Sequence, residues 1–229
     1  MDITSKLKIL DQIYAIYDKF TATLDPACQK YCDHCCTSGV TLTTLEGYKI
    51  IDSLASEAEK AISKKIQAAS EIKRLRPQLT TNGLAQLCAR GADPPQEEDN
   101  LDLPACPLLQ DHQCPIYELR PYGCRCLVSR DNCGDKGFAE IDDFVLSVNT
   151  VFLQTIEHLD TSGCSGNLVD VLQAMSDEKK RAAYASGALH CSANRLVINQ
   201  PLEVLMIPPE QRAAMEPILQ ELRQIKNWH

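Results

Sequence analysis

The distribution of cysteine constrains this chain more than any other feature of its sequence. Twelve of its 229 residues are cysteines, with four between residues 28 and 36 and five between residues 106 and 133. A protein of this length does not need disulfides to build a core, and a reducing cytoplasm keeps thiols from pairing. Metal ligation by thiolates is therefore the natural interpretation.

The composition of the sequence restricts where the protein is expected to reside and what it is expected to bind. The first twenty residues lack the basic start, apolar run and small-residue cleavage site of a secretory signal, and no stretch approaches the ~20 apolar residues of a spanning helix. We therefore expect a cytoplasmic protein with no membrane partner. The net charge of −8 argues against a nucleic-acid partner. An exported protein whose cysteines form disulfides is the alternative.

Helical periodicity dominates outside the cysteine groups. Apolar residues recur at spacings of three and four from Ile3 to Tyr17, from Ile51 to Ile72 and from Ile141 to Leu159. Thr43 and Glu46 form a capping-box pattern. Further helices are expected around residues 84–87, 168–175 and after Asp177, with short strands possible in residues 195–207. Near the C-terminus, Pro217 suits a first helical turn.

The two cysteine groups interrupt this pattern. Residues 106–133 carry many Cys, Pro, Gly and Asp residues without usable periodicity, as expected of a segment folded around ligands. The predicted fold is mainly α, a single helical domain over residues 1–229 with at most short strands. Within it, the irregular segments 28–36 and 106–133 are expected to converge on a metal centre.

The first group reads C-QKY-C-DH-C-C, at Cys28, Cys32, Cys35 and Cys36. Such tight spacing lets several sulfurs reach one centre from a single loop. Thiolates select zinc, copper(I) or iron–sulfur clusters over magnesium or calcium. The second group contains Cys106, Cys114, Cys124, Cys126 and Cys133, at looser spacings.

Together the groups carry a family resemblance. The order C-x3-C-x2-C-C, then CPLL-x4-C-x-IY-x2-RP-x2-CR, resembles the YkgJ-like family of cysteine-cluster domains, which are described as zinc- or iron-chelating. The resemblance covers residues 28–36 and 106–133. It implies metal binding, and the cluster positions correspond to Cys28, Cys32, Cys35, Cys36, Cys106, Cys114, Cys124 and Cys133.

Eight thiolates suit two four-coordinate sites, or one cluster with spare thiols. Because neighbouring side chains diverge, we expect Cys35 and Cys36 to serve two different centres, or one centre and a free thiol. Zinc and a [4Fe–4S] cluster both accept four thiolates with the same total charge. Four cysteines within nine residues resemble a cluster-binding loop, which favours an iron–sulfur cluster over zinc as the cofactor.

Other residues near the cysteines have two interpretations. Cations beside thiolates either donate hydrogen bonds to sulfur or lie at the surface, and histidines there are either nitrogen ligands or exposed loop residues. These residues are Lys30, Arg120, Arg125, Arg130, His34 and His112. Cys88, Cys164 and Cys191 stand alone and are expected to pack in the core, whereas both roles stay open for Cys126.

Three functions fit this pattern. The first is a metal-binding protein without catalysis, acting in redox chemistry or metal handling. The second is a cluster-dependent enzyme, because Cys28-x3-Cys32-x2-Cys35 matches the spacing of radical S-adenosylmethionine enzymes and some proteins with YkgJ-like clusters resemble protein-lysine methylases. Those radical enzymes use a parallel β/α barrel, which this sequence does not predict. The third is a structural zinc protein.

Overall fold

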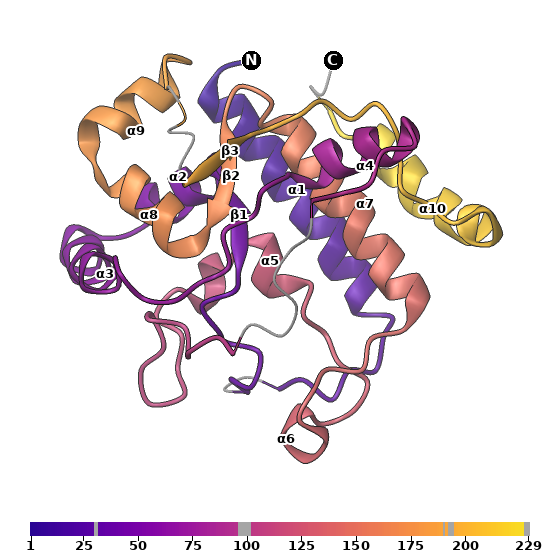
Figure 1. The fold of residues 1–229 in the computed structure, drawn as a ribbon, viewed down its shortest axis with the longest axis horizontal. Helices are drawn as coiled ribbons and strands as arrows, with labels where there is room; N and C mark the ends of the chain where they lie inside the picture. Colours follow the sequence, from indigo (N-terminus) through magenta and orange to yellow (C-terminus); the bar gives the residue numbers. More distant parts are fainter. Residues whose placement is uncertain (30–31, 96–101, 190, 192–194, 227–229) are drawn as a thin grey trace.

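Helices make up most of the regular structure. The computed structural model describes residues 1–29, 32–95, 102–189, 191 and 195–226 (Figure 1). Its α-helices are α1 (Ile3–Thr21), α2 (Thr44–Asp52), α3 (Ser56–Ala68), α4 (Thr81–Ala89), α5 (Tyr122–Arg125), α6 (Cys133–Lys136), α7 (Asp143–Leu159), α8 (Leu168–Ser176), α9 (Glu178–Ala185) and α10 (Arg212–Arg223). Two 3-10 turns, η1 (Tyr117–Leu119) and η2 (Pro209–Gln211), accompany strands β1 (Thr41–Thr43), β2 (Cys164–Asn167) and β3 (Leu196–Ile198). The prediction of a mainly α protein with short strands is confirmed.

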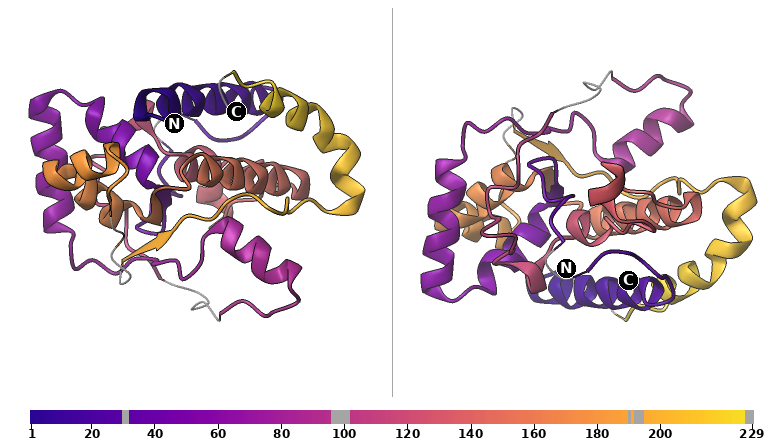
Figure 2. Two further views of the ribbon diagram at one scale, coloured as in Figure 1. Left: turned by 90° about the horizontal axis from the view of Figure 1, so that it is seen from above. Right: turned by 90° about the horizontal axis from the view of Figure 1, so that it is seen from below.

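The two longest helices, α1 and α7, lie side by side, as the views of Figure 2 show. Asp2 caps α1 by accepting a hydrogen bond from the Ser5 amide at 2.9 Å. Ile13 of α1 and Phe152 of α7 are completely buried, so the predicted apolar stripes face the core. No described helix is long and apolar enough to cross a bilayer.

The apolar residues from Ile51 to Ile72, predicted to lie on a continuous helical stripe, are divided between two helices and the chain that follows them. The capping box between Thr43 and Glu46 is present and starts α2. Residues 53–55 separate α2 from α3, which ends at Ala68, so Ile72 lies beyond both. Helix α8 packs against α2 and α3.

The sheet consists of three short antiparallel strands in the order β1-β2-β3. Leu42 pairs with Gly166, and Ser165 pairs with Val197. Gly166 allows close approach here, because a Cβ at this position would lie 2.5 Å from Leu196 Cδ2. Strand β3 falls within the region where short strands were expected.

The buried carboxylate of Glu46 anchors the second cysteine segment to the helical core. It accepts hydrogen bonds from the Tyr14 hydroxyl at 2.7 Å and from the Tyr122 amide, the first residue of α5, at 2.6 Å. The Tyr122 ring stacks against Phe152 with centroids 5.8 Å apart. A Cβ on Gly123 would lie 2.5 Å from the Thr41 carbonyl oxygen, so only glycine allows α5 to sit this close to β1.

Helix α10 contains Pro217 in its interior. The helix begins at Arg212, five residues earlier, so the prediction of a proline in the first turn is wrong. Proline lacks the N–H that a helix interior uses, but the buried side chains of Met215 and Leu222 hold both sides of this position against the core. Tertiary packing outweighs the local preference.

Candidate metal centre

Seven of the eight predicted ligands line one pocket of about 470 Å³. Its lining comes mainly from the chain between α1 and β1 and from the segment that leads into α5. Figure 1 shows the loops of these two segments at one end of the molecule. Apolar residues, among them Leu108, Ile116 and Leu127, form much of the remaining wall. The cysteines in the wall are Cys28, Cys32, Cys35, Cys36, Cys106, Cys114 and Cys124.

Backbone hydrogen bonds join the two cysteine segments across about 70 residues of sequence. The Cys106 amide donates to the Cys36 carbonyl oxygen at 2.8 Å, and the Ser38 amide donates to the Pro104 carbonyl oxygen at 2.9 Å. Thr37 and Ala105 form an isolated antiparallel bridge between them. Cys36 and Cys106 therefore occupy adjacent positions on two extended strands of chain.

Two Cys-Pro turns, at Cys106 and Cys114, present backbone amides to sulfur. Burial raises the pKa of the Cys106 thiol, and hydrogen bonds from the Leu108 and Leu109 amides lower it. Burial likewise raises the pKa of the Cys114 thiol, and a hydrogen bond from the Ile116 amide lowers it. Amides placed in this way stabilise thiolates by donating hydrogen bonds to sulfur, as they do around metal-bound cysteines.

Arg120 is the only one of the four predicted cations that lines the pocket within the described residues. Its guanidinium carbon lies 3.7 Å above the centre of the Tyr117 ring, and its charge lowers the pKa values of the Cys114 and Cys124 thiols, which burial raises. The buried Nε of Arg120 has no hydrogen-bond partner in the part of the chain that the structure describes. Since buried donors are normally paired, this nitrogen marks a place for an acceptor such as metal-bound sulfur.

The first segment holds Cys28 against the chain that leads to Cys133. The Ser129 amide donates to the Cys28 sulfur at 3.2 Å, and the Ala27 amide donates to the Ser129 carbonyl oxygen at 2.9 Å. Burial raises the pKa of Cys28, the Ser129 amide lowers it, and the nearby thiols of Cys133, Cys32 and Cys35 raise it further. Cys133 does not line the pocket, but its thiol is one of the three that raise the pKa of Cys28.

The thiols of Cys35 and Cys36 interact with each other, and their assignment to two different centres, or to one centre and a free thiol, stays a prediction. The Cys36 thiol donates a hydrogen bond to Cys35, which lowers the pKa of Cys35 to about 6 and raises the pKa of Cys36.

The remaining predicted cations lie away from the sulfurs or outside the described residues. Arg125 stacks over the Tyr14 ring at 4.5 Å and donates to the Arg120 carbonyl oxygen at 2.9 Å. Arg130 forms ion pairs with Glu140 and Asp142 at the surface. Lys30 lies outside the described residues.

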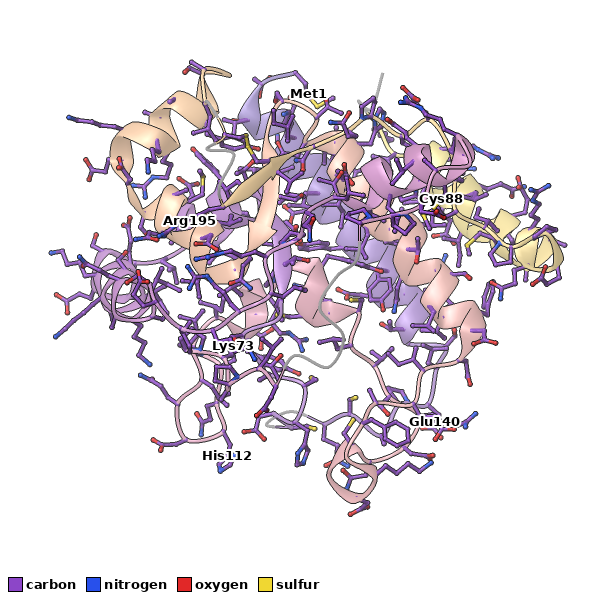
Figure 3. All side chains as sticks on the ribbon, in the orientation of Figure 1. Met1, Lys73, Cys88, His112, Glu140 and Arg195 are labelled. Carbon is purple, nitrogen blue, oxygen red and sulfur yellow. A yellow bond between two sulfur atoms is a disulfide. The ribbon has the colours of Figure 1, made fainter. Side chains whose placement is uncertain are left out.

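His112 and His34 each contact a residue of the other cysteine segment or of the chain next to it. His112 lines the pocket at the exposed edge labelled in Figure 3, and its Nδ1 lies 2.8 Å from Asp33 Oδ2. His112 and Asp111 both have positive φ, 62° and 45°, which aims the His112 ring at the first segment. His34 lies against Gly134, where an added Cβ would come within 2.7 Å of its Nε2.

The other cysteines divide between core, surface and a disulfide. Cys126 packs in the core, where burial raises its pKa to about 12, and it does not line the pocket. Cys88 is exposed on α4, contrary to the prediction of core packing (Figure 3). Cys164 is buried as predicted, but neither it nor Cys191 stands alone, because a disulfide joins them.

Within the described residues, no three His, Cys, Asp or Glu side chains are arranged closely enough to hold a metal ion. The thiols thus share a pocket wall without forming a finished coordination sphere, and their assignment as ligands stays a prediction. The comparisons with known proteins found no family model, no curated protein and no solved structure that matches this chain.

Proposed function

We propose that this protein binds a metal centre through the cysteine thiolates of its two irregular segments. The observation that carries the proposal is the shared pocket: seven cysteines from segments about 70 residues apart in sequence line one wall. Free thiols in an ordinary core would be scattered among apolar residues. Cysteines gathered from distant parts of the chain are typical of a site that folds around a ligand.

The surroundings of the sulfurs fit thiolate–metal chemistry. The amides of Leu108, Ile116 and Ser129 donate to three different cysteine sulfurs. The Nε of Arg120, which has no partner among the described residues, supplies a further donor, and the positive charge of Arg120 offsets part of the anionic charge that ligand thiolates carry. The residues that would hold the metal are the eight predicted cysteines, and the bound centre would supply a redox couple or a structural crosslink.

An iron–sulfur cluster is the form we favour. Zinc bonds to sulfur are about 2.3 Å long, so a single zinc ion draws its four thiolates close together. The thiols here are instead spread around a cavity of about 470 Å³, which suits a larger polynuclear centre. By analogy with the YkgJ-like resemblance, the role would be in redox chemistry or metal handling in the cytoplasm.

The radical S-adenosylmethionine alternative gains no support from the fold. Those enzymes place their cluster loop after the first strand of a parallel barrel. Here Cys28 to Cys35 follow helix α1, and the described sheet is a three-stranded antiparallel one. A cluster-dependent methylase of another architecture would need a methyl-donor site in addition to the cysteine pocket.

Elemental analysis with a visible absorption spectrum, on protein purified without oxygen, tests the proposal. Iron with acid-labile sulfide and a broad band near ~400 nm establishes a cluster, whereas colourless protein containing zinc establishes a zinc site. Cys32→Ser and Cys124→Ser should lower metal content and solubility together. Cys88→Ser is the matched control, because Cys88 is a free, exposed cysteine away from the pocket.

Protein that carries neither metal, and takes up neither on reconstitution, would refute metal binding. Wild-type metal content in both Cys32→Ser and Cys124→Ser would refute the ligand assignment instead. A loss of metal in Cys88→Ser of equal size would show that the effect is a general one of thiol removal and not of the pocket.

A further inference from the structure

We propose that the Cys164–Cys191 disulfide is a redox-active pair, which exchanges two electrons with a dithiol while the protein stays folded, and that Cys191 is the sulfur attacked. The pair is separate from the proposed metal site, because neither cysteine lines the pocket. The inference therefore adds a second site to the molecule and does not depend on metal binding.

The disulfide coexists with ten free cysteines in the same chain. Oxidation that acted on thiols in general would also reach Cys88, which is exposed. In the cytoplasm proposed above, thiols are kept reduced, and the disulfides that do form there are usually catalytic or redox-sensing. On that proposed location the Cys164–Cys191 bond is of this reversible kind.

The two cysteines of the pair differ in exposure. Cys164 is 0% exposed, whereas Cys191 is only partly buried at the edge of the core. A thiolate from solvent therefore has access to Cys191 and not to Cys164. Disulfides with an accessible sulfur are the labile ones, because exchange requires direct attack on that sulfur.

This difference in exposure defines the order of the exchange. The first thiolate of the dithiol bonds to the Cys191 sulfur, and the disulfide breaks with its electron pair on Cys164, which takes up a proton. The second thiolate of the dithiol then attacks its own mixed disulfide and releases Cys191. The dithiol loses two electrons and two protons, and the two protein sulfurs gain them.

The position of Cys164 does not depend on the disulfide. Its amide donates a hydrogen bond to Thr44 Oγ1 at 3.0 Å, and the Thr44 hydroxyl donates to the buried Asp160 carboxylate at 2.7 Å. Cys164 also pairs with Ile198 in the sheet. Because none of these contacts uses the sulfur, β2 keeps its place when the disulfide opens.

The elements on either side of Cys191 have anchors of their own. Before it, the Tyr184 hydroxyl of α9 donates to Asp160 Oδ1 at 2.6 Å. After it, the Asn199 amide, next to β3, donates to the Gly163 carbonyl oxygen at 3.1 Å, and Asn199 Nδ2 donates to the Asp160 carbonyl oxygen at 2.8 Å. Opening the disulfide therefore removes one covalent tie and leaves α9 and β3 attached.

Thiol mapping of the wild-type protein tests the redox activity. Protein purified without reductant is treated with dithiothreitol, without denaturant, and then alkylated, and mass spectrometry maps Cys164 and Cys191. Both should become alkylated in nearly every molecule while circular dichroism stays native, and oxidised glutathione should restore the disulfide after the dithiothreitol is removed. Absence of the disulfide in the untreated protein, or its reduction only in urea, would overturn the proposal.

Two single variants test which sulfur is attacked. With oxidised glutathione, Cys191 of Cys164→Ala should form a mixed disulfide in nearly every molecule, whereas Cys164 of Cys191→Ala should stay a free thiol. Cys88 is the internal standard for an exposed thiol in both variants. Equal modification of Cys164 and Cys191 would refute the assignment of Cys191 as the attacked sulfur.

Metal content, measured on the same samples, keeps this inference distinct from the proposed function. A disulfide that resists reduction in the folded protein would refute the redox pair whatever metal is found. Reversible exchange in a protein that takes up neither iron nor zinc would support the redox pair and refute metal binding alone.

Discussion

Helix α8 is held in place by a buried ion pair whose loss should be severe. The Asp170 carboxylate lies 2.7 Å and 2.9 Å from Nη2 and Nε of Arg74, and both side chains are 1% exposed. The Arg74 Nη1 also donates to the Ile72 carbonyl oxygen at 2.9 Å, so the guanidinium is satisfied only while Asp170 is present.

Asp170→Ala would leave the Arg74 charge buried without its partner. Removing one member of a buried pair costs about 3–5 kcal/mol of unfolding free energy, a large share of the roughly 5–15 kcal/mol that proteins possess. At about 2–4 °C per kcal/mol for a chain of this size, Tm should fall by roughly 6–20 °C. Urea denaturation and a thermal melt, followed by circular dichroism, measure both quantities.

Glu221→Ala is the matched control, because it also removes one carboxylate from an ion pair. Lys19 and Glu221 are 2.7 Å apart, but their side chains are 70% and 39% exposed, so this loss should cost at most about 1 kcal/mol. Combining Arg74→Met with Asp170→Leu should recover much of the stability that Asp170→Ala loses. Equal destabilisation by Asp170→Ala and Glu221→Ala would refute the reasoning.

Three further outcomes are expected. Gly123→Ala should lower the unfolding free energy by about 1–3 kcal/mol and reduce metal content without removing a thiol, because its Cβ would lie 2.5 Å from the Thr41 carbonyl oxygen; unchanged metal content would contradict this. Cys191→Ser should cost about 3–4 kcal/mol under non-reducing conditions, because its disulfide to Cys164 spans 27 residues, while metal content stays at the wild-type value. Metal affinity, measured by chelator competition, should rise with pH, since burial raises the pKa of pocket thiols such as Cys106 and binding must release their protons; an affinity independent of pH would argue against thiolate ligands.

Much of the helical framework is predictable because its signals are local. The apolar stripe from Ile3 to Tyr17 and the capping box of Thr43 and Glu46 both form as expected. Strands β1 and β2 have only three and four residues, and β2 includes Gly166, so neither shows a strand pattern. Their pairing depends on contacts with distant parts of the chain. Contacts with the rest of the protein also override a local signal at Pro217, because packing keeps α10 helical on both sides of this proline.

Cysteine spacing indicates which thiols gather but not how they are arranged. The sequence pattern identified the seven cysteines of the pocket wall, although it could not separate Cys126, which the turn of α5 directs into the core. The contact between Cys35 and Cys36 depends on side-chain rotamers, which spacing does not specify. Arg120 could not be distinguished from Arg125 and Arg130, because only the fold determines which guanidinium faces the sulfurs.

The pocket wall is assembled from pieces that leave the ribosome at different times. Cys36 emerges about 70 residues before Cys106 and nearly 100 before Cys133. At a synthesis rate of roughly 5–20 residues per second, the first four thiols wait about 5–20 seconds for the last of their partners. During that interval they form an incomplete set that follows the residues of α1 in the chain. Insertion of the proposed metal into a complete site would therefore be confined to the time after residue 133 has been made, and an oxidant that reaches the nascent chain earlier would find four thiols within nine residues.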